Sequence, residues 1–238
     1  MRSLFAFALL FIAGAADAHD LITAESAQRY LENAVLWQQQ SVAAPDHSER
    51  ARADLKLGMM LDEIRDLLNR DLAVHGEVQG LASNYLVAEL KRVGTPLAFS
   101  ERRHYFMANA GYYRAALQLG LEGDLATEAR LRLLRGEFYD SFGSDPFETD
   151  QTSQQFQQQL DLVDKLMDDA ISEPDLEEVR FIAAIVYARA AKLATDTGKR
   201  SDFRDKALAT ADRFERQYPD SLRTAAMPVI REALRALR

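Results

Sequence analysis

Histidines are the first residues to consider, because a neutral imidazole is both a general base and a common metal ligand. The chain has four of them, His19, His47, His75 and His104. None belongs to a His-Glu-x-x-His pair, and none lies close in sequence to a cluster of carboxylates. We therefore expect surface or interfacial histidines, with no catalytic residue, metal or other cofactor. His19 has one alternative role: as the first residue of a processed chain, its amine and imidazole could together chelate Cu(II).

The other patterns that would indicate an enzyme are missing or incomplete. The chain has no cysteine, which excludes a thiolate metal site, a disulfide and a cysteine nucleophile. It also has no Gly-x-Ser-x-Gly elbow. Residues 198–201, Gly-Lys-Arg-Ser, are similar to the end of a phosphate-binding loop, but the upstream glycine would fall at Leu193 and the segment follows a predicted helix. We therefore expect no enzyme, although Glu137 and Glu148, which lie near aromatic residues, are the candidate acids if the chain cleaves glycans.

Residues 100–142 are rich in aromatic side chains and arginines. On a helix, Arg132 and Arg135 share a side and could bind a carboxylate of a partner. The alternative is an ordinary charged helix face, because Glu128 and Glu137 lie nearby. Most of the aromatic residues must enter the core, and those left on a concave surface could anchor a bound peptide. The predicted binding residues are Tyr105, Tyr112, Arg132, Arg135 and Tyr139.

The N-terminus has the pattern of a secretory signal peptide. Arg2 is followed by an apolar run at residues 4–13 and by small residues at Ala16 and Ala18. We expect cleavage between Ala18 and His19. The alternative, a membrane anchor, would need about 20 apolar residues. Since no cysteine is available for lipidation, we expect a soluble periplasmic chain without stable membrane insertion. The net charge of −8 argues against nucleic-acid binding, which depends on neutralising phosphates with Lys and Arg.

The hydrophobic pattern predicts an all-α protein. Apolar residues make up 47% of the chain, glycine and proline are few, and the apolar positions recur at steps of three and four without sustained period-two alternation. We expect about nine helices, near residues 23–42, 46–73, 81–93, 100–119, 124–142, 152–170, 172–198, 202–218 and 221–237. The short connections favour antiparallel neighbours. We divide the chain into a signal peptide at 1–18, an N-terminal helical region at 19–98 and a hairpin region at 99–238, with the two helical regions possible as one continuous array.

The last two predicted helices are amphipathic and are joined at a tight turn. Pro219 ends the first, and Asp220 or Ser221 can cap the second. The expected apolar stripe of the first is Phe203, Ala207, Ala211, Phe214 and Tyr218. That of the second is Leu222, Ala226, Val229, Ala233 and Leu237. Neither helix can bury its stripe alone, so the pair must pack against other helices.

This pair resembles a tetratricopeptide repeat. Ala207, Ala211, Phe214 and Pro219 keep the offsets of zero, four, seven and twelve found in the second helix of such a repeat. Residues 217–221, Gln-Tyr-Pro-Asp-Ser, resemble the repeat boundaries of bacterial periplasmic tetratricopeptide proteins of the barrel-assembly lipoprotein and cell-division coordinator type, although this chain lacks the lipidated cysteine. The resemblance covers the C-terminal pair well and the hairpins from Ser100 onward loosely. It implies antiparallel helix hairpins stacked as an α-solenoid.

These observations lead to two functional hypotheses. The first is an exported periplasmic helical-repeat protein that acts as a scaffold and binds an envelope protein or peptide segment in the groove between its hairpins. The alternative is an accessory or catalytic helical domain acting on peptidoglycan, which would need an activated carboxylic acid in a cleft.

Overall fold

The structure is a computed structural model that describes residues 22–78, 80–141, 147, 151–169 and 171–237. The predicted signal peptide and His19 lie outside these residues. Of these residues, 78% are helical, in nine α-helices and one 3-10 helix, so the all-α prediction is confirmed. The chain forms two compact units, Met1–Gly136 and Glu137–Arg238, and passes from one to the other within a helix. The boundary that we place at 98/99, where the long predicted helices give way to hairpins, stays a prediction.

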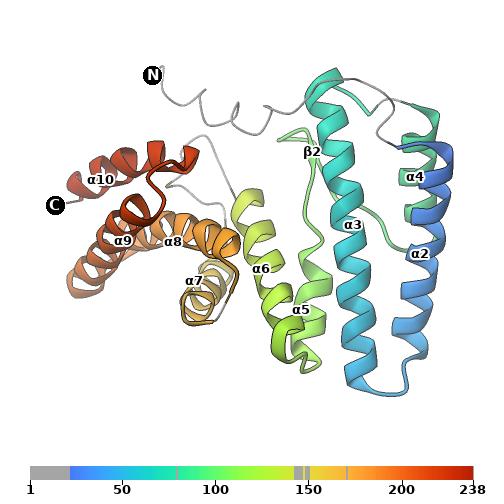
Figure 1. Cartoon of the computed structure of the whole chain (residues 1–238), viewed down its shortest axis with the longest axis horizontal. Helices are drawn as coiled ribbons and strands as arrows, with labels where there is room; N and C mark the ends of the chain where they lie inside the picture. The colour runs from blue at the N-terminus through green and yellow to red at the C-terminus, as the bar shows by residue number, and fades with distance from the viewer. Residues whose placement is uncertain (1–21, 79, 142–146, 148–150, 170, 238) are drawn as a thin grey trace. The chain divides into compact units, whose positions relative to one another are not determined.

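The first unit is built around its longest helix (Figure 1). Its elements are α2 (Ala24–Ala43), α3 (His47–His75), α4 (Leu81–Arg92), β1 (Phe99–Ser100), β2 (Tyr105–Phe106), α5 (Ala110–Gln118) and the part of α6 (Gly123–Asp140) up to residue 136. Helices α2 and α5 and strand β2 all pack against α3, and α4 packs against α2. The bounds of the first three helices agree with the predicted ranges to within about two residues.

Local capping explains where α2 and α3 begin and end. The hydroxyl of Thr23 accepts a hydrogen bond from the backbone N–H of Ser26. The carboxylate of Asp46 accepts one from the N–H of Glu49, at a distance of 2.8 Å. Both bonds satisfy N–H groups that have no partner inside a helix. Gly76 ends α3 in the left-handed conformation, with φ of 76°, which glycine adopts without a steric penalty.

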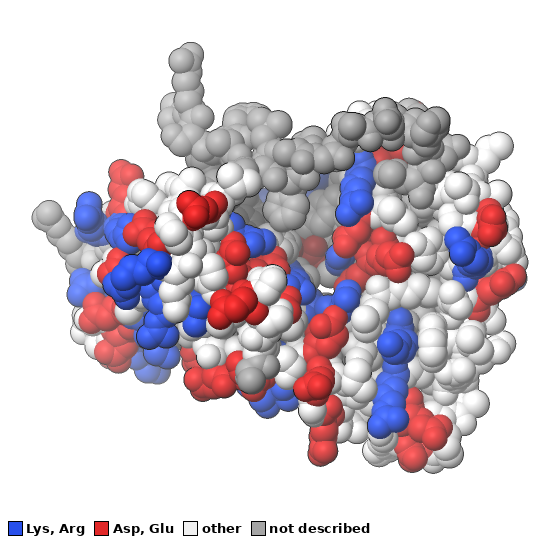
Figure 2. All heavy atoms as spheres, viewed as in Figure 1, with Lys and Arg blue, Asp and Glu red and all other residues white. Residues whose placement is uncertain are grey.

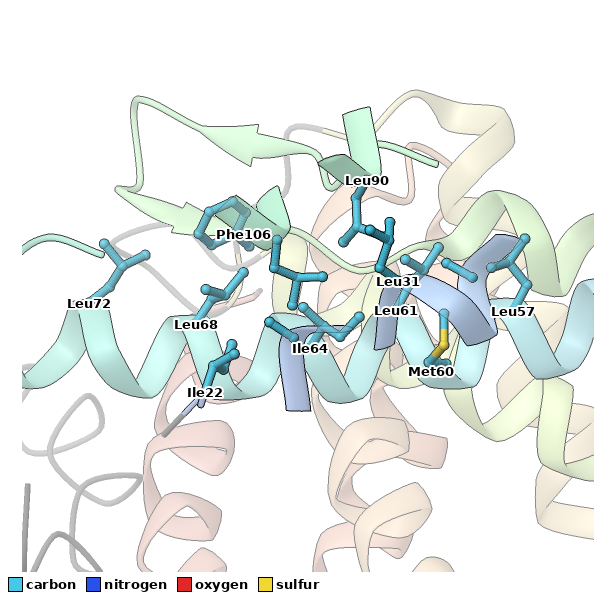
Figure 3. Packing of buried hydrophobic residues seen from close by; sticks show 13 residues of the cluster. Ile22, Leu31, Leu57, Met60, Leu61, Ile64, Leu68, Leu72, Leu90 and Phe106 are labelled. Carbon is cyan, nitrogen blue, oxygen red and sulfur yellow. The ribbon is translucent and has the colours of Figure 1, made fainter. Parts of the chain in front are cut away.

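The core of the first unit follows one face of α3 (Figure 3). The buried residues of this face are Leu57, Met60, Leu61, Ile64, Leu68 and Leu72. They recur at steps of three and four and face Leu31 of α2, Leu90 of α4 and Phe106 of β2. Each such side chain contributes about 1.5–3 kcal/mol when fully buried. The contacts of α3 therefore hold the other elements of this unit in place.

The predicted helix at 100–119 is wrong over its first half. Residues 99–106 form an antiparallel hairpin in which Phe99 pairs with Phe106, and the helix begins only at Ala110. The reason is a contact with α3: Asn69 Oδ1 accepts from the N–H of Phe106 at 2.7 Å, and Asn69 Nδ2 donates to its carbonyl oxygen at 2.9 Å. These tertiary hydrogen bonds replace those that a helix would supply.

His104 holds the turn of this hairpin. Its φ of 54° lies in the left-handed region, and its Nε2 lies 2.8 Å from the carbonyl oxygen of Gly76, so the ring donates to the end of α3. The same ring packs edge-on against Phe99. The conformation of His104 therefore follows from its partners on α3 and β1.

The second unit is built around α8 (Figure 1). Its elements after the end of α6 are α7 (Ser153–Asp168), α8 (Glu173–Leu193), α9 (Thr197–Gln217), the 3-10 helix η1 (Leu222–Ala226) and α10 (Met227–Arg235). Helices α7, α9 and α10 all pack against α8, and α8 is buried over most of its length. The predicted capping box is confirmed, because Thr152 and Gln155 cap α7 reciprocally.

Gly198 does not end α8 as predicted. Helix α8 ends at Leu193, and Gly198 lies in the first turn of α9, which begins five residues before the predicted position. The carboxylate of Asp196 caps α9 by accepting from the N–H of Lys199 at 2.8 Å. A strong cap therefore outweighs the low helix propensity of a glycine in the first turn.

The predicted stripe of the last helix is right at Ala226, which is buried, but wrong at two other positions. Leu222 is 70% exposed and Val229 is 43% exposed, whereas Met227, Ile230 and Leu234 are buried. Residues 222–226 form a 3-10 helix before α10 begins. A 3-10 helix has three residues per turn, so it rotates the following face relative to a continuous α-helix. Pro228 suits the first turn of α10, where no N–H is needed.

No helix in the described ranges combines the length and the apolar character needed to cross a bilayer. On the face shown in Figure 2, acidic and basic side chains are interspersed over both units.

Candidate binding grooves

An open groove of about 610 Å³ lies in the first unit, where three helices meet. We call it the α5 groove. Helix α2 contributes Gln38, Ser41 and Val42, helix α3 contributes Arg50, Asp54 and Leu57, and the segment 108–115 contributes Asn109, Gly111, Tyr112 and Arg114 among others. Its size is that of a site for a small ligand or a short peptide segment.

Residues 109–111 at the start of α5 line this groove and have hydrogen-bond donors without an acceptor in the described ranges. Asn109 occupies the N-cap position, but its side chain makes no capping hydrogen bond. Its Nδ2 is buried and has no hydrogen-bond partner among the described residues. The N–H groups of Ala110 and Gly111, likewise, have no acceptor within the described part of the chain. A Cβ added to Gly111 would meet nothing within 4 Å, so there is open space beside its Cα.

The charged residues of the groove differ in exposure. Arg50 is exposed, and its guanidinium makes no ion pair or hydrogen bond in the described ranges; Arg114 lines the groove from α5. Asp54 is only 6% exposed and accepts a hydrogen bond from Ser41 Oγ at 2.5 Å. Burial raises the pKa of Tyr112, and the charge of Asp54 raises that pKa further. The groove therefore has one exposed cationic group, Arg50, and a recessed carboxylate, Asp54.

Asp62 fixes α5 against α3. Tyr113 donates its hydroxyl proton to Asp62 Oδ2 at 2.5 Å, and the backbone N–H of Asn109 donates to Oδ1 at 3.2 Å. Arg65 donates to the same Oδ1 at 3.0 Å. Burial raises the pKa of Tyr113 well above its usual value, and the charge of Asp62 adds to this effect, so the phenol stays a donor. The close approach requires Gly58, because a Cβ there would lie 3.0 Å from Tyr113 Cε1.

A second groove, of about 510 Å³, is formed mainly by α2 and α3 of the same unit, and we call it the Trp37 groove. It is lined by Tyr30, Asn33, Trp37, Lys56, Met59, Met60, Glu63, Asp66 and Arg132. Trp37 is the only tryptophan of the chain. Tyr30 donates to Glu63 at 2.7 Å. Burial, followed by this hydrogen bond, raises the pKa of Tyr30 to about 12.

The predicted binding residues do not share one surface. Tyr112 lines the α5 groove and Arg132 lines the Trp37 groove. Arg132 also donates to Glu128. This contact is the one expected from the alternative interpretation, an ordinary charged helix face. Tyr105 lies on β2, where its hydroxyl accepts from Arg103 at 3.4 Å. Arg135 lies on α6 and lines neither groove.

Tyr139 belongs to the second unit. Its hydroxyl donates to Glu178 of α8 at 2.8 Å, and burial raises its pKa above the usual tyrosine value. The cavity described in this unit holds about 230 Å³ and is lined by Phe147, Ala188, Lys192 and four residues of the chain end after 232. Tyr139 does not line it. We therefore assign Tyr139 a packing role between α6 and α8.

The residues that sequence reasoning missed are Arg50, Asn109 and Gly111. An asparagine directly before Ala110 is a helix-start signal, but we expected helix throughout 100–119. With the hairpin known, that signal would have marked the start of α5. Arg50 carries no signal of its own, because a single arginine on an exposed helix face is common.

In the described ranges, the candidate acid Glu137 and the histidines line none of the described hollows. Glu137 is buried on α6, and Glu148 lies outside the described residues. His75 pairs with Asp71 at 2.9 Å, and His104 contacts Gly76. No set of three or more His, Asp or Glu in this part of the chain is placed to hold a metal ion. The peptidoglycan alternative stays a prediction.

No protein-family model, no curated protein and no solved structure matches this chain.

Proposed function

We propose that this chain is an exported helical scaffold of the cell envelope that binds a segment of another protein in the α5 groove. The observation that carries the proposal is the groove itself, which joins apolar walls with hydrogen-bond donors that have no acceptor within the described residues. Such concave sites with a few convergent polar groups are the usual form of a binding site. The signal-peptide pattern of residues 1–18 supports export to the periplasm.

The helical architecture supports the same role. Antiparallel helices on rigid supports commonly present extended binding surfaces, as in the tetratricopeptide proteins that the C-terminal pair resembles. In the first unit, the Asp62 hydrogen bonds fix the donors of α5 relative to α3, so the groove does not have to be ordered on binding. A preformed site lowers the entropic cost of association.

Photocrosslinking from the groove tests the proposal. Val42 lines the groove and is 83% exposed, so a benzoylphenylalanine placed there reaches a bound segment without entering the core. Leu81 is the matched control, because it is 92% exposed on α4 and lines neither described groove of this unit. We expect the mature chain, residues 19–238, to crosslink one discrete envelope protein from position 42 and not from position 81.

A substitution that fills the groove provides the second part of the crosslinking test. Gly111→Trp places a large side chain at the open start of α5 and should abolish the product obtained from position 42. A product that persists in Gly111→Trp, or appears equally from position 81, would contradict the proposal. Retention of the chain on isolated peptidoglycan, with no protein product from position 42, would favour the glycan-directed alternative.

A further inference from the structure

We propose that the α5 groove recognises the C-terminal carboxylate of its partner segment. This inference rests on the proposed function and adds the chemistry that the groove selects. The groups that need a ligand there are donors: Asn109 Nδ2, which is buried without a partner, and the N–H groups of Ala110 and Gly111. A buried donor without an acceptor is costly, and a ligand oxygen removes that cost.

The charge around these donors selects an anionic acceptor. Arg50 lines the groove from α3 and has no acidic partner in the described part of the chain, although Asp54 lies one helical turn away. Asp54 is instead held by Ser41 and is recessed. A guanidinium binds a carboxylate through charge-assisted hydrogen bonds, which are about twice as strong as neutral ones. The start of α5 adds favourable partial positive charge.

The donor types favour a chain terminus over an acidic side chain. Two successive backbone N–H groups together with a side-chain amide form the kind of backbone nest that captures terminal carboxylates. Ala110 and Gly111 carry little or no side chain, so the main-chain end of a peptide can approach their N–H groups closely. The apolar walls at Val42, Leu57 and Ala115 can then contact the residues that precede the terminus.

Nuclear magnetic resonance on the full mature chain tests this inference with defined probes. The first probe is an equimolar mixture of acetylated tetrapeptides with a free carboxylate. The second is the same mixture with an amidated terminus, and the third is an amidated mixture with an internal glutamate. We expect the first probe to shift the side-chain amide of Asn109 and the N–H resonances of Ala110 and Gly111, and to bind about ten- to a hundredfold more tightly than the second.

Three variants supply independent readouts. Arg50→Gln should weaken binding of the first probe about tenfold or more. Arg52→Gln is its matched control, because Arg52 is exposed on the same helix two residues away and does not line the groove. Asp54→Asn should strengthen binding a few-fold, because it removes a like charge and keeps an oxygen for Ser41. All three changes are checked for an unaltered fold by the dispersion of the remaining resonances.

The outcomes separate this inference from the proposed function. Equal binding of the first two probes, or equal effects of Arg50→Gln and Arg52→Gln, would overturn the inference. Binding of the internal-glutamate probe as tightly as the first would overturn the choice of a chain terminus. One of these results could be obtained while position 42 still gives a crosslinked product that Gly111→Trp abolishes. The scaffold proposal would then stand, and only the inference of carboxylate recognition would fall. Absence of that product would remove the scaffold proposal itself.

Discussion

Removing one hydroxyl, in Tyr113→Phe, measures how strongly α5 is tied to α3. The hydroxyl donates to buried Asp62 at 2.5 Å. After the substitution, Asp62 keeps Arg65 and the N–H of Asn109 but loses one charge-assisted bond. Hydrogen bonds to charged groups contribute about 1.5–3 kcal/mol, and we expect a loss of that size in the free energy of unfolding of the first unit.

Trp37 makes the measurement selective, because the only tryptophan lies in the same unit as Tyr113. Urea unfolding followed by its fluorescence should show a midpoint lowered by roughly 1 M, for a slope of about 2 kcal/mol per molar urea. The shift should be the same at pH 6 and pH 9, since the raised pKa of Tyr113 keeps the phenol protonated at both.

Tyr85→Phe is the control for this experiment. Tyr85 is 49% exposed in the same unit and its hydroxyl makes no hydrogen bond in the described structure, so its substitution should change stability by about 0.5 kcal/mol or less. If Tyr113→Phe moved the midpoint no further than Tyr85→Phe, the hydrogen bond to Asp62 would not stabilise the unit, and our account of how the groove is positioned would be refuted.

Three more predictions concern packing, alkaline pH and acidic pH. Gly58→Ala should destabilise the first unit by about 1 kcal/mol despite a better helix propensity, because the new Cβ would lie 3.0 Å from the fixed ring of Tyr113. Because the folded state keeps Tyr30 protonated up to a pKa of about 12, the stability advantage of wild type over Tyr30→Phe should shrink as the pH rises from 10 to 12. Arg231→Met should destabilise the second unit at pH 7 by about 0.5–1 kcal/mol, and this effect should fade in acid, because the hydrogen bond from Arg231 lowers the pKa of Glu215.

Each of these predictions has a control or a contrary result. Gly111→Ala adds the same methyl group in open space and should be neutral or slightly stabilising, so equal losses at the two glycines would contradict the packing argument. A difference between wild type and Tyr30→Phe that stays constant from pH 8 to pH 12 would contradict the raised pKa. Arg213→Met, at an exposed arginine of α9 without an ion pair in the described structure, should have little effect at either pH. Thermal unfolding followed by circular dichroism supplies the readout for the two arginine variants.

Most of the secondary structure could be predicted because its determinants are local. Asp46 with Glu49, and Thr152 with Gln155, mark helix starts through bonds that span three residues. The failures arose where a distant group or an irregular turn decided the outcome. The hairpin at 99–106 depends on Asn69, which is 37 positions away in sequence from Phe106. The predicted apolar stripe of the last helix failed because residues 222–226 form a 3-10 helix, in which the rotation per residue differs from that of an α-helix.

The grooves were harder to predict than the helices, for the same physical reason. Tyr112 and Arg132 were found because they lie in an aromatic and arginine-rich stretch. Arg50 and Asn109 come from segments nearly sixty residues apart in sequence, and only the packing of α5 on α3 brings them to one groove. Sequence periodicity shows which face of a helix is buried, but it does not show which helices become neighbours.

The pairing of Asn69 with Phe106 also bears on the order in which the first unit folds. Strands of two residues cannot persist alone, and here the backbone groups of β2 are bonded by a side chain of α3. The hairpin can therefore form only after α3 is helical and docked, once the intervening loop has closed. During unfolding, the hydrogen bonds between Asn69 and Phe106 can break without disturbing the face of α3 that packs on α2. The amide protons of residues 99–106 should accordingly exchange with deuterium well before those in the middle of α3.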